Sequence, residues 1–88
     1  MDYRKGAEII KALSHPTRLM ILECLLDKNE CVQDMQMLLK KRQANVSQHL
    51  AILKNAGLID YIQEGKKRCY FIRRKDIAKK IIGCIKAL

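Results

Sequence analysis

The 88-residue chain has no tryptophan, one phenylalanine and one proline, and acidic residues are half as frequent as basic ones. Because aromatic side chains are so few, its hydrophobic core must be built from aliphatic residues. A chain of this length buries only a modest core, so a second subunit is an expected way to bury more apolar surface. Its apolar runs are far shorter than the roughly 20 residues of a membrane-spanning helix, so we expect no membrane span.

The first residues also lack the pattern of an export signal. The segment MDYRKGAEII carries charges where a signal peptide has its apolar core. The four cysteines of the chain are too few for a small disulfide-stabilised domain. We therefore expect a cytoplasmic protein with reduced cysteines, which serve as core residues, metal ligands or redox groups.

Positive charge is the most pronounced feature of the composition. Eighteen Lys and Arg residues stand against nine acidic ones, for a formal net charge of +9. Nine basic and two acidic residues lie between positions 61 and 88, so +7 of this charge falls in the last third. Concentrated positive charge favours a polyanionic partner, nucleic acid first, although a solvated lysine-rich face would give the same count.

The hydrophobic pattern predicts one domain, residues 1–88, with five helices and one β-hairpin. Pro16 is placed to begin a helix and Gly57 to end one. The period of the pattern changes at LIDYIQ and RCYFIR, two short β-like segments separated by EGKK. The order is that of an α+β winged helix-turn-helix. We place the helix-turn-helix at about 31–56, the wing at about 58–73, and two outer helices at about 3–13 and 75–88, the second helix covering 16–27.

The helix after the basic turn KKRQ has the composition of a helix that reads DNA. Val46, Leu50 and Leu53 recur at helical spacing and must face the core. Gln and Asn side chains can make paired hydrogen bonds to adenine in the major groove, and small residues allow close approach. An ordinary polar helix face is the alternative. The residues opposite the core face include no acidic one: Ala44, Ser47, Gln48, Ala51 and Asn55.

Basic residues flank this helix and mark the hairpin tip. Residues 40–42 precede the helix, Lys54 lies near its end, and the tip carries Lys66, Lys67 and Arg68. Phosphate contacts supply affinity and register, whereas the helix supplies sequence information. DNA binding is therefore the favoured function. The sequence shows no Ser-His-Asp set, paired carboxylates or phosphate loop that would indicate an enzyme.

Three segments closely resemble the ArsR/SmtB repressors: LSHPTRLMIL, NVSQHLAILKNAGLI and EGKKRCYFI. The resemblance spans about residues 9–72. It implies a homodimer joined through its first and last helices, which binds operator DNA and releases it when an inducer binds. For His49, which flanks the core face, packing or a phosphate contact is the alternative to reading a base. The family's DNA-contacting positions fall on Gln43, Asn45, Ser47, Gln48 and His49, with the wing at residues 66–68.

The turn before the DNA-reading helix departs from the family. Relatives usually place a Gly, an apolar residue and a Ser where this chain has Lys40, Lys41 and Arg42. The exchange removes a typical N-cap and makes the turn unusually basic. We therefore expect stronger nonspecific DNA binding.

The two metal sites known in this family are incomplete here. The last helix contains no histidine to join Asp76 in a zinc site. The site on the third helix uses a Cys-x-Cys pair, because two thiolates select soft ions, and this chain has Cys31 and Gln33 there. A soft metal ion or metalloid held by Cys31 with cysteines from elsewhere stays an open alternative.

Cys24 and Cys84 are the preferred candidates for sensing an inducer. In a thiol-sensing branch of the family, one cysteine on the second helix and one on the last react with sulfur species and become bridged. Cys24 falls one position from that branch's cysteine on the second helix. Cys84 falls about two helical turns before that branch's cysteine on the last helix. Each could instead pack as a small apolar residue. Cys31, at the expected start of the third helix, would be a reactive accessory thiol, and we assign Cys69 only to packing on the wing.

Three functions follow in order of preference. The first is a repressor released from its operator through cysteine thiol chemistry or soft-metal binding. The second is a winged helix DNA-binding regulator without its own inducer. The third is a protein–protein adaptor that uses the winged fold as a docking surface.

Overall fold

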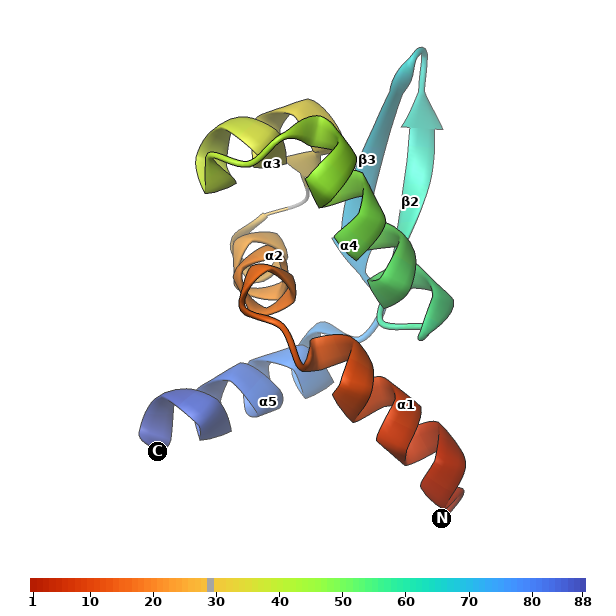
Figure 1. Ribbon diagram of the computed structural model, residues 1–88, viewed down its shortest axis with the longest axis vertical. Coiled ribbons are helices and arrows are strands. Elements are labelled where there is room, and N and C mark those ends of the chain that lie inside the picture. Colours follow the sequence, from red (N-terminus) through yellow and green to blue (C-terminus); the bar gives the residue numbers. More distant parts are fainter. Residues whose placement is uncertain (29) are drawn as a thin grey trace.

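The computed structural model describes residues 1–88 except Asn29, and it describes the side chains of all of these except Glu30, Cys31 and Gln33. Figure 1 shows α2 at the centre, with α3, α4 and the β2–β3 hairpin at one end and α1 and α5 at the other. The predicted α+β winged helix-turn-helix is confirmed. Its elements are α1 (Tyr3–Leu13), α2 (Pro16–Asp27), β1 (Glu30–Cys31), α3 (Val32–Leu39), α4 (Gln43–Asn55), β2 (Ile59–Glu64), β3 (Lys67–Ile72) and α5 (Lys75–Ala87).

Local sequence signals begin the first two helices. The carboxylate of Asp2 accepts a hydrogen bond from the backbone N–H of Lys5 at 3.1 Å and caps α1. His15 caps α2, because its Nδ1 accepts the N–H of Thr17 at 3.1 Å, and Pro16 follows as the first helical residue. These caps satisfy amide groups that a helix start otherwise leaves without partners.

The turn into α4 lacks such a cap, as the sequence predicted. Arg42 occupies the N-cap position and its side chain makes no capping hydrogen bond. Lys40, where relatives usually have Gly, adopts a φ of 54° in the left-handed region that favours glycine. The basic turn at residues 40–42 therefore combines a strained backbone at Lys40 with a helix start at Arg42 that has no side-chain cap.

The sheet has three strands in the order β1-β3-β2, and β1 was not predicted. β2 and β3 pair in antiparallel register from Ile59 opposite Ile72 to the tip, where Gly65 has a φ of 61°. β1 pairs on the other side of β3, with Cys31 opposite Cys69. The placement of Cys31 at a helix start was therefore wrong, because its backbone belongs to a strand and α3 begins at Val32.

The core is aliphatic, as the composition requires, with Tyr70 as a buried aromatic residue. Burying each large aliphatic side chain stabilises the fold by about 1.5–3 kcal/mol. The described helices include none that is long and apolar enough to cross a membrane. Side chains from α2, α3, α4 and β2 form the fully buried centre: Ile21, Leu22, Leu25, Met35, Val46, Leu50, Leu53 and Ile59.

The apolar residues of α5 divide between two surfaces. Ala78 and Ile82 are buried against the rest of the chain. Ile77 and Ile85 stay 39% and 44% exposed. An exposed ion pair of 3.0 Å joins Lys86 near the end of α5 to Glu23 on α2. The helix thus packs on its own subunit with one face and leaves a second apolar face uncovered.

Candidate nucleic-acid interface

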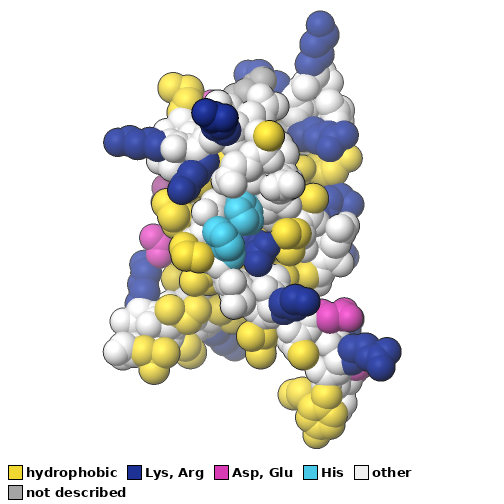
Figure 2. Space-filling model, in the orientation of Figure 1, with side chains coloured by type: hydrophobic (Ala, Val, Ile, Leu, Met, Phe, Trp, Pro, Cys, Tyr) yellow, Lys and Arg dark blue, Asp and Glu magenta, His cyan; other side chains and the backbone are white. Residues whose placement is uncertain are grey.

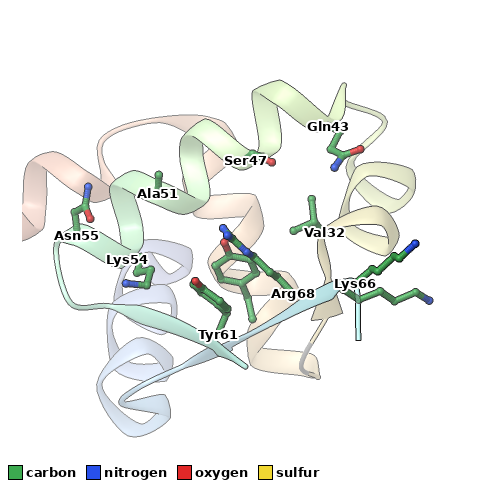
Figure 3. Close-up of a pocket in the computed structure, with 11 residues that line it drawn as sticks. Val32, Gln43, Ser47, Ala51, Lys54, Asn55, Tyr61, Lys66 and Arg68 are labelled. Carbon is green, nitrogen blue, oxygen red and sulfur yellow. The ribbon is translucent and has the colours of Figure 1, made fainter. Parts of the chain in front are cut away.

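A hollow of about 470 Å³ lies between α4 and the wing. Figure 3 shows α4 along one side, the two wing strands along the other, and side chains from both converging on the space between them. Among the residues whose side chains are described, its lining contains amides, hydroxyls and basic groups and no acidic residue. The lining residues are Val32, Gln43, Ser47, Ala51, Lys54, Asn55, Tyr61, Lys66, Lys67, Arg68 and Tyr70.

Tyr61 holds two of the basic groups at this hollow. The guanidinium carbon of Arg68 lies 4.8 Å from the centre of its ring, and the Lys54 Nζ lies 5.7 Å away. Both distances are typical of cation–π contacts. The ring itself is braced by Tyr70 across the strands, with centroids 5.3 Å apart. One cation from α4 and one from β3 therefore lie beside the same ring.

Sequence reasoning did not include Tyr61 among the functional residues. It is half-buried, and its ring joins the helix to the wing. The available signal was two tyrosines in the hairpin strands with basic residues beside them. That signal becomes specific only when the register Tyr61 opposite Tyr70 is known.

The two faces of α4 are those that the helical pattern predicted. Val46, Leu50 and Leu53 are fully buried. Gln43 and Ser47 line the hollow, whereas Asn45 and Gln48 are exposed on α4 outside it. Since Ala44 and Ala51 are exposed as well, the outer surface of α4 is small, neutral and rich in amides.

His49 is the exception among the predicted contact residues. It is 8% exposed, and its ring centroid lies 4.4 Å from that of His15. Burial lowers the pKa of His49 below its ordinary 6.5, and the nearby charges of His15, Arg18 and Lys41 lower it further. Since the ring is buried and packs on His15, we leave His49 out of the contact surface.

Basic side chains surround the hollow at the end of the molecule opposite α1 and α5. Figure 2 shows Lys and Arg projecting around the α3–α4 turn and the tip of the wing. All of the predicted basic contact residues are exposed, namely Lys54, Lys66, Lys67 and Arg68, together with residues 40–42. The Gln63 side-chain amide donates to the carbonyl of Gly65 at 3.1 Å and shapes the tip that carries three of them.

The structure does not gather the cysteine candidates into one site. Cys24 is half-buried and lines a second hollow with Met20, Leu38 and Ile82, whereas Cys84 is exposed on α5 and does not line it. Neither is disulfide-bonded. The side chain of Cys31 lies outside the described residues. In the part of the chain that the structure describes, no three His, Cys, Asp or Glu residues are grouped to hold a metal ion.

Comparison with known proteins decides the family. The model of the bacterial regulatory protein arsR family matches residues 15–61. This chain belongs to the ArsR family. An HTH-type transcriptional regulator of Methanocaldococcus jannaschii is 46% identical over 81 residues, covering 88% of this chain and 91% of that one. The biofilm growth-associated repressor of Agrobacterium fabrum is 36% identical over 83 residues, covering 93% and 69%.

The likeness to a solved structure spans nearly the whole of this chain. The homodimeric winged helix-turn-helix DNA-binding domain from Mycobacterium bovis, a possible ArsR-family regulator, has a TM-score of 0.86 and 26% identity. It covers 97% of this chain, which in turn covers 78% of that domain. The protein is therefore a DNA-binding transcriptional regulator of the ArsR family and not an enzyme.

Proposed function

We propose that this ArsR-family chain is a homodimeric repressor, which binds an operator with α4 in the major groove and the wing on adjoining phosphates. The observation that carries the proposal is the hollow between α4 and the wing. There, amides of the helix and the cations of Lys54 and Arg68 face the same space, and no carboxylate is among the described side chains that line it. DNA matches both features, because its phosphates are anionic and its base edges carry hydrogen-bonding groups.

The outer face of α4 has the dimensions and chemistry for a major groove about 12 Å wide. Ala44, Ser47 and Ala51 are exposed and small, so the helix backbone can approach the bases closely. Gln48 and Asn45 supply amides for paired hydrogen bonds to adenine. Lys66 and Lys67 then reach phosphates beside the groove, which adds affinity without sequence preference.

Exposed apolar residues at the opposite end support a homodimer. Tyr3 and Ile10 on α1 are 81% and 70% exposed, and Ile77 and Ile85 on α5 stay uncovered as well. Both helices lie at the lower end of the molecule in Figure 1, where Ile9 of α1 and Ile77 of α5 line one hollow, and α1 also borders the C-terminal end of α4 at Asn55. A two-fold dimer through this end would bury them and present two α4 helices to successive major grooves.

We propose that an inducer acts on the cysteines, by thiol modification or by soft-metal binding. Cys24 lies on α2 and Cys84 on α5, the helix that carries part of the proposed dimer surface. A group added to either side chain would favour one dimer shape over another. Release follows when the favoured shape no longer matches the spacing of the operator half-sites.

Salt dependence tests the DNA-binding proposal. The protein is titrated into a labelled random duplex and into duplexes selected from a random-sequence pool. A protein that makes about 6–10 phosphate contacts loses roughly 10³- to 10⁵-fold in affinity between about 50 and 200 mM salt. Affinity that does not change with salt would contradict the proposal and favour a protein–protein adaptor.

Release is tested with single Cys→Ser variants of all four cysteines on the selected operator. Each variant is challenged with a persulfide donor, arsenite, cadmium or zinc. A response lost in Cys24→Ser and Cys84→Ser alone would support thiol sensing by that pair. Loss of the arsenite or cadmium response in Cys31→Ser alone would instead indicate a soft-metal sensor. Identical behaviour of parent and variants would mean a regulator that is not induced through cysteine.

A further inference from the structure

The ladder between β1 and β3 brings two cysteines to opposite positions. Cys31 and Cys69 are Cα partners in antiparallel strands. Opposite residues of such strands have Cα atoms about 4.5 or 5.5 Å apart, within the range that a disulfide spans. Cys69 is disulfide-bonded, whereas Cys24 and Cys84 are not. The expectations of reduced cysteines throughout and of a packing role alone for Cys69 were therefore wrong at this position. Since the chain has four cysteines, the register and the count both point to Cys31.

We propose that Cys31 and Cys69 form a reversible disulfide, closed by low-molecular-weight disulfides and opened by the corresponding thiols. We further propose that the closed bond holds the wing in place beside α4. This second part rests on the proposed DNA-binding function, whereas the bond itself does not. The site differs from the Cys24 and Cys84 pair in position, since it connects the start of the helix-turn-helix to the wing.

The reaction is a two-step exchange. One thiolate of the pair attacks the small disulfide, forms a mixed disulfide and expels one small thiolate. The other cysteine then attacks the protein sulfur of that mixed disulfide and expels the second small thiolate. Two electrons pass from the protein dithiol to the small disulfide. The two protons of the protein thiols end on the two small thiols, so atoms and electrons balance.

Cys69 is accessible to such a small disulfide, because it is half-buried at the surface of the wing. Its sulfur lies 3.9 Å from the Oε2 of Glu64, which can accept a hydrogen bond from the thiol of the reduced form and so give that form a partner.

The position of the pair connects it to the DNA-binding hollow. Val32 follows Cys31 in the chain, and Arg68 and Tyr70 flank Cys69; all three line the hollow. β1 contains two residues, so its backbone pairing alone is a short attachment. A covalent bond at this point adds a fixed link between the entry to α3 and the strand that carries Arg68. The closed form should therefore hold the wing ready for DNA.

The bond is tested by mapping on the intact chain. The protein is reduced with dithiothreitol or oxidised with hydroxyethyl disulfide, and remaining thiols are labelled with N-ethylmaleimide before proteolysis and mass spectrometry. We expect the peptides of Cys31 and Cys69 to be joined to each other in the oxidised sample and separate in the reduced one. An oxidised sample in which both cysteines are labelled, or in which either is bridged to Cys24 or Cys84, would overturn the proposal.

The effect on DNA is tested by titrating both forms into the same random duplex at low salt. If the open form holds its wing in place about a third of the time, its affinity falls about threefold. The comparison uses the Cys24→Ser, Cys84→Ser protein as the parent, because the proposed sensing cysteines would otherwise react with the small disulfide as well. Adding Cys69→Ser to this parent should give equal binding under both conditions. Equal affinity of the two parent forms would overturn the role of the bond in placing the wing. A mapped bridge in a protein that binds no DNA would contradict the proposed function and leave the bond standing.

Discussion

The imidazole rings of His15 and His49, 4.4 Å apart, join the first turn of α2 to the buried side of α4. His15 uses its Nδ1 as an acceptor for the N–H of Thr17. The Nδ1 of His49 is buried and has no hydrogen-bond partner among the described residues. Two adjacent rings near Arg18 and Lys41 therefore form a place where added positive charge is unfavourable.

The burial of His49 and, to a lesser extent, its nearness to His15 predict a fold that is sensitive to acid. Because the pKa of His49 is lowered below its ordinary 6.5, the unfolded chain takes up the proton before the native state does. The free energy of unfolding that depends on neutral His49 is thus fully present above pH 6.5 and is lost as the pH falls toward the pKa of His49 in the folded state. We expect the Tm of the parent to fall more than that of His49→Leu between about pH 7.5 and pH 5.5. A parallel decline in the two proteins would mean that other groups cause the acid sensitivity.

Two substitutions separate sequence reading from phosphate binding. Gln48→Ala should weaken binding to the selected operator by about 1–3 kcal/mol if Gln48 makes paired hydrogen bonds to a base. It should leave binding to random DNA nearly unchanged. Lys67→Ala should weaken both complexes about equally and reduce the slope of log affinity against log salt by about 1. Fluorescence anisotropy over a salt series measures both effects, and equal losses for both variants on both DNAs would contradict this division.

A lysine on the uncovered face of α5 should separate the dimer. Ile85 is 44% exposed, so Ile85→Lys leaves the core of its own subunit intact. We expect monomers by sedimentation velocity and an operator affinity reduced by about 100-fold or more, because two linked half-sites become one. Ile62→Lys is the matched control for sedimentation alone, since Ile62 is 54% exposed on the wing and not on α5, and it should remain dimeric. If Ile85→Lys remains dimeric, the dimer is formed elsewhere.

Because the start of α4 has no side-chain cap, a capping residue at position 42 should stabilise the fold, and loss of the Arg42 charge should weaken DNA binding. Arg42→Ser supplies a capping hydroxyl, and Arg42→Ala does not, while both remove the same positive charge. By denaturant unfolding, the serine variant should be more stable than the alanine variant by about 1 kcal/mol. Both should bind random DNA more weakly than the parent, and to a similar extent. Equal stability of the two variants would show that α4 gains nothing from a cap at this position.

The regular elements could be predicted because each is encoded by local patterns. Pro16 and Gly57 stand at helix boundaries, and Val46, Leu50 and Leu53 mark the buried face of α4. The hairpin was visible from two alternating segments around Gly65. These features depend on neighbours within a few residues, so a single sequence is enough to find them.

The remaining features depend on contacts between distant segments. β1 has two residues and no detectable period, and it exists because Glu30 and Cys31 pair with β3 almost 40 residues later. Similarly, the burial of His49 reflects its contact with His15. The role of Tyr61 requires both the strand register and the position of Lys54 on α4. Spacing within any one segment gives no information about these pairings.

The position of β3 in the sheet has a consequence for how the wing meets a duplex. Cys69 and Tyr70 pair with strands on both sides, whereas Lys67 and Arg68 pair with β2 alone. Amide hydrogens near the base of the hairpin should therefore exchange with solvent more slowly than those toward its tip. Such a gradient of backbone stability makes the hairpin rigid at its base and flexible at its tip. Its cationic end can then follow backbones of different groove width, so operators of unequal curvature remain within reach of one rigid reading helix.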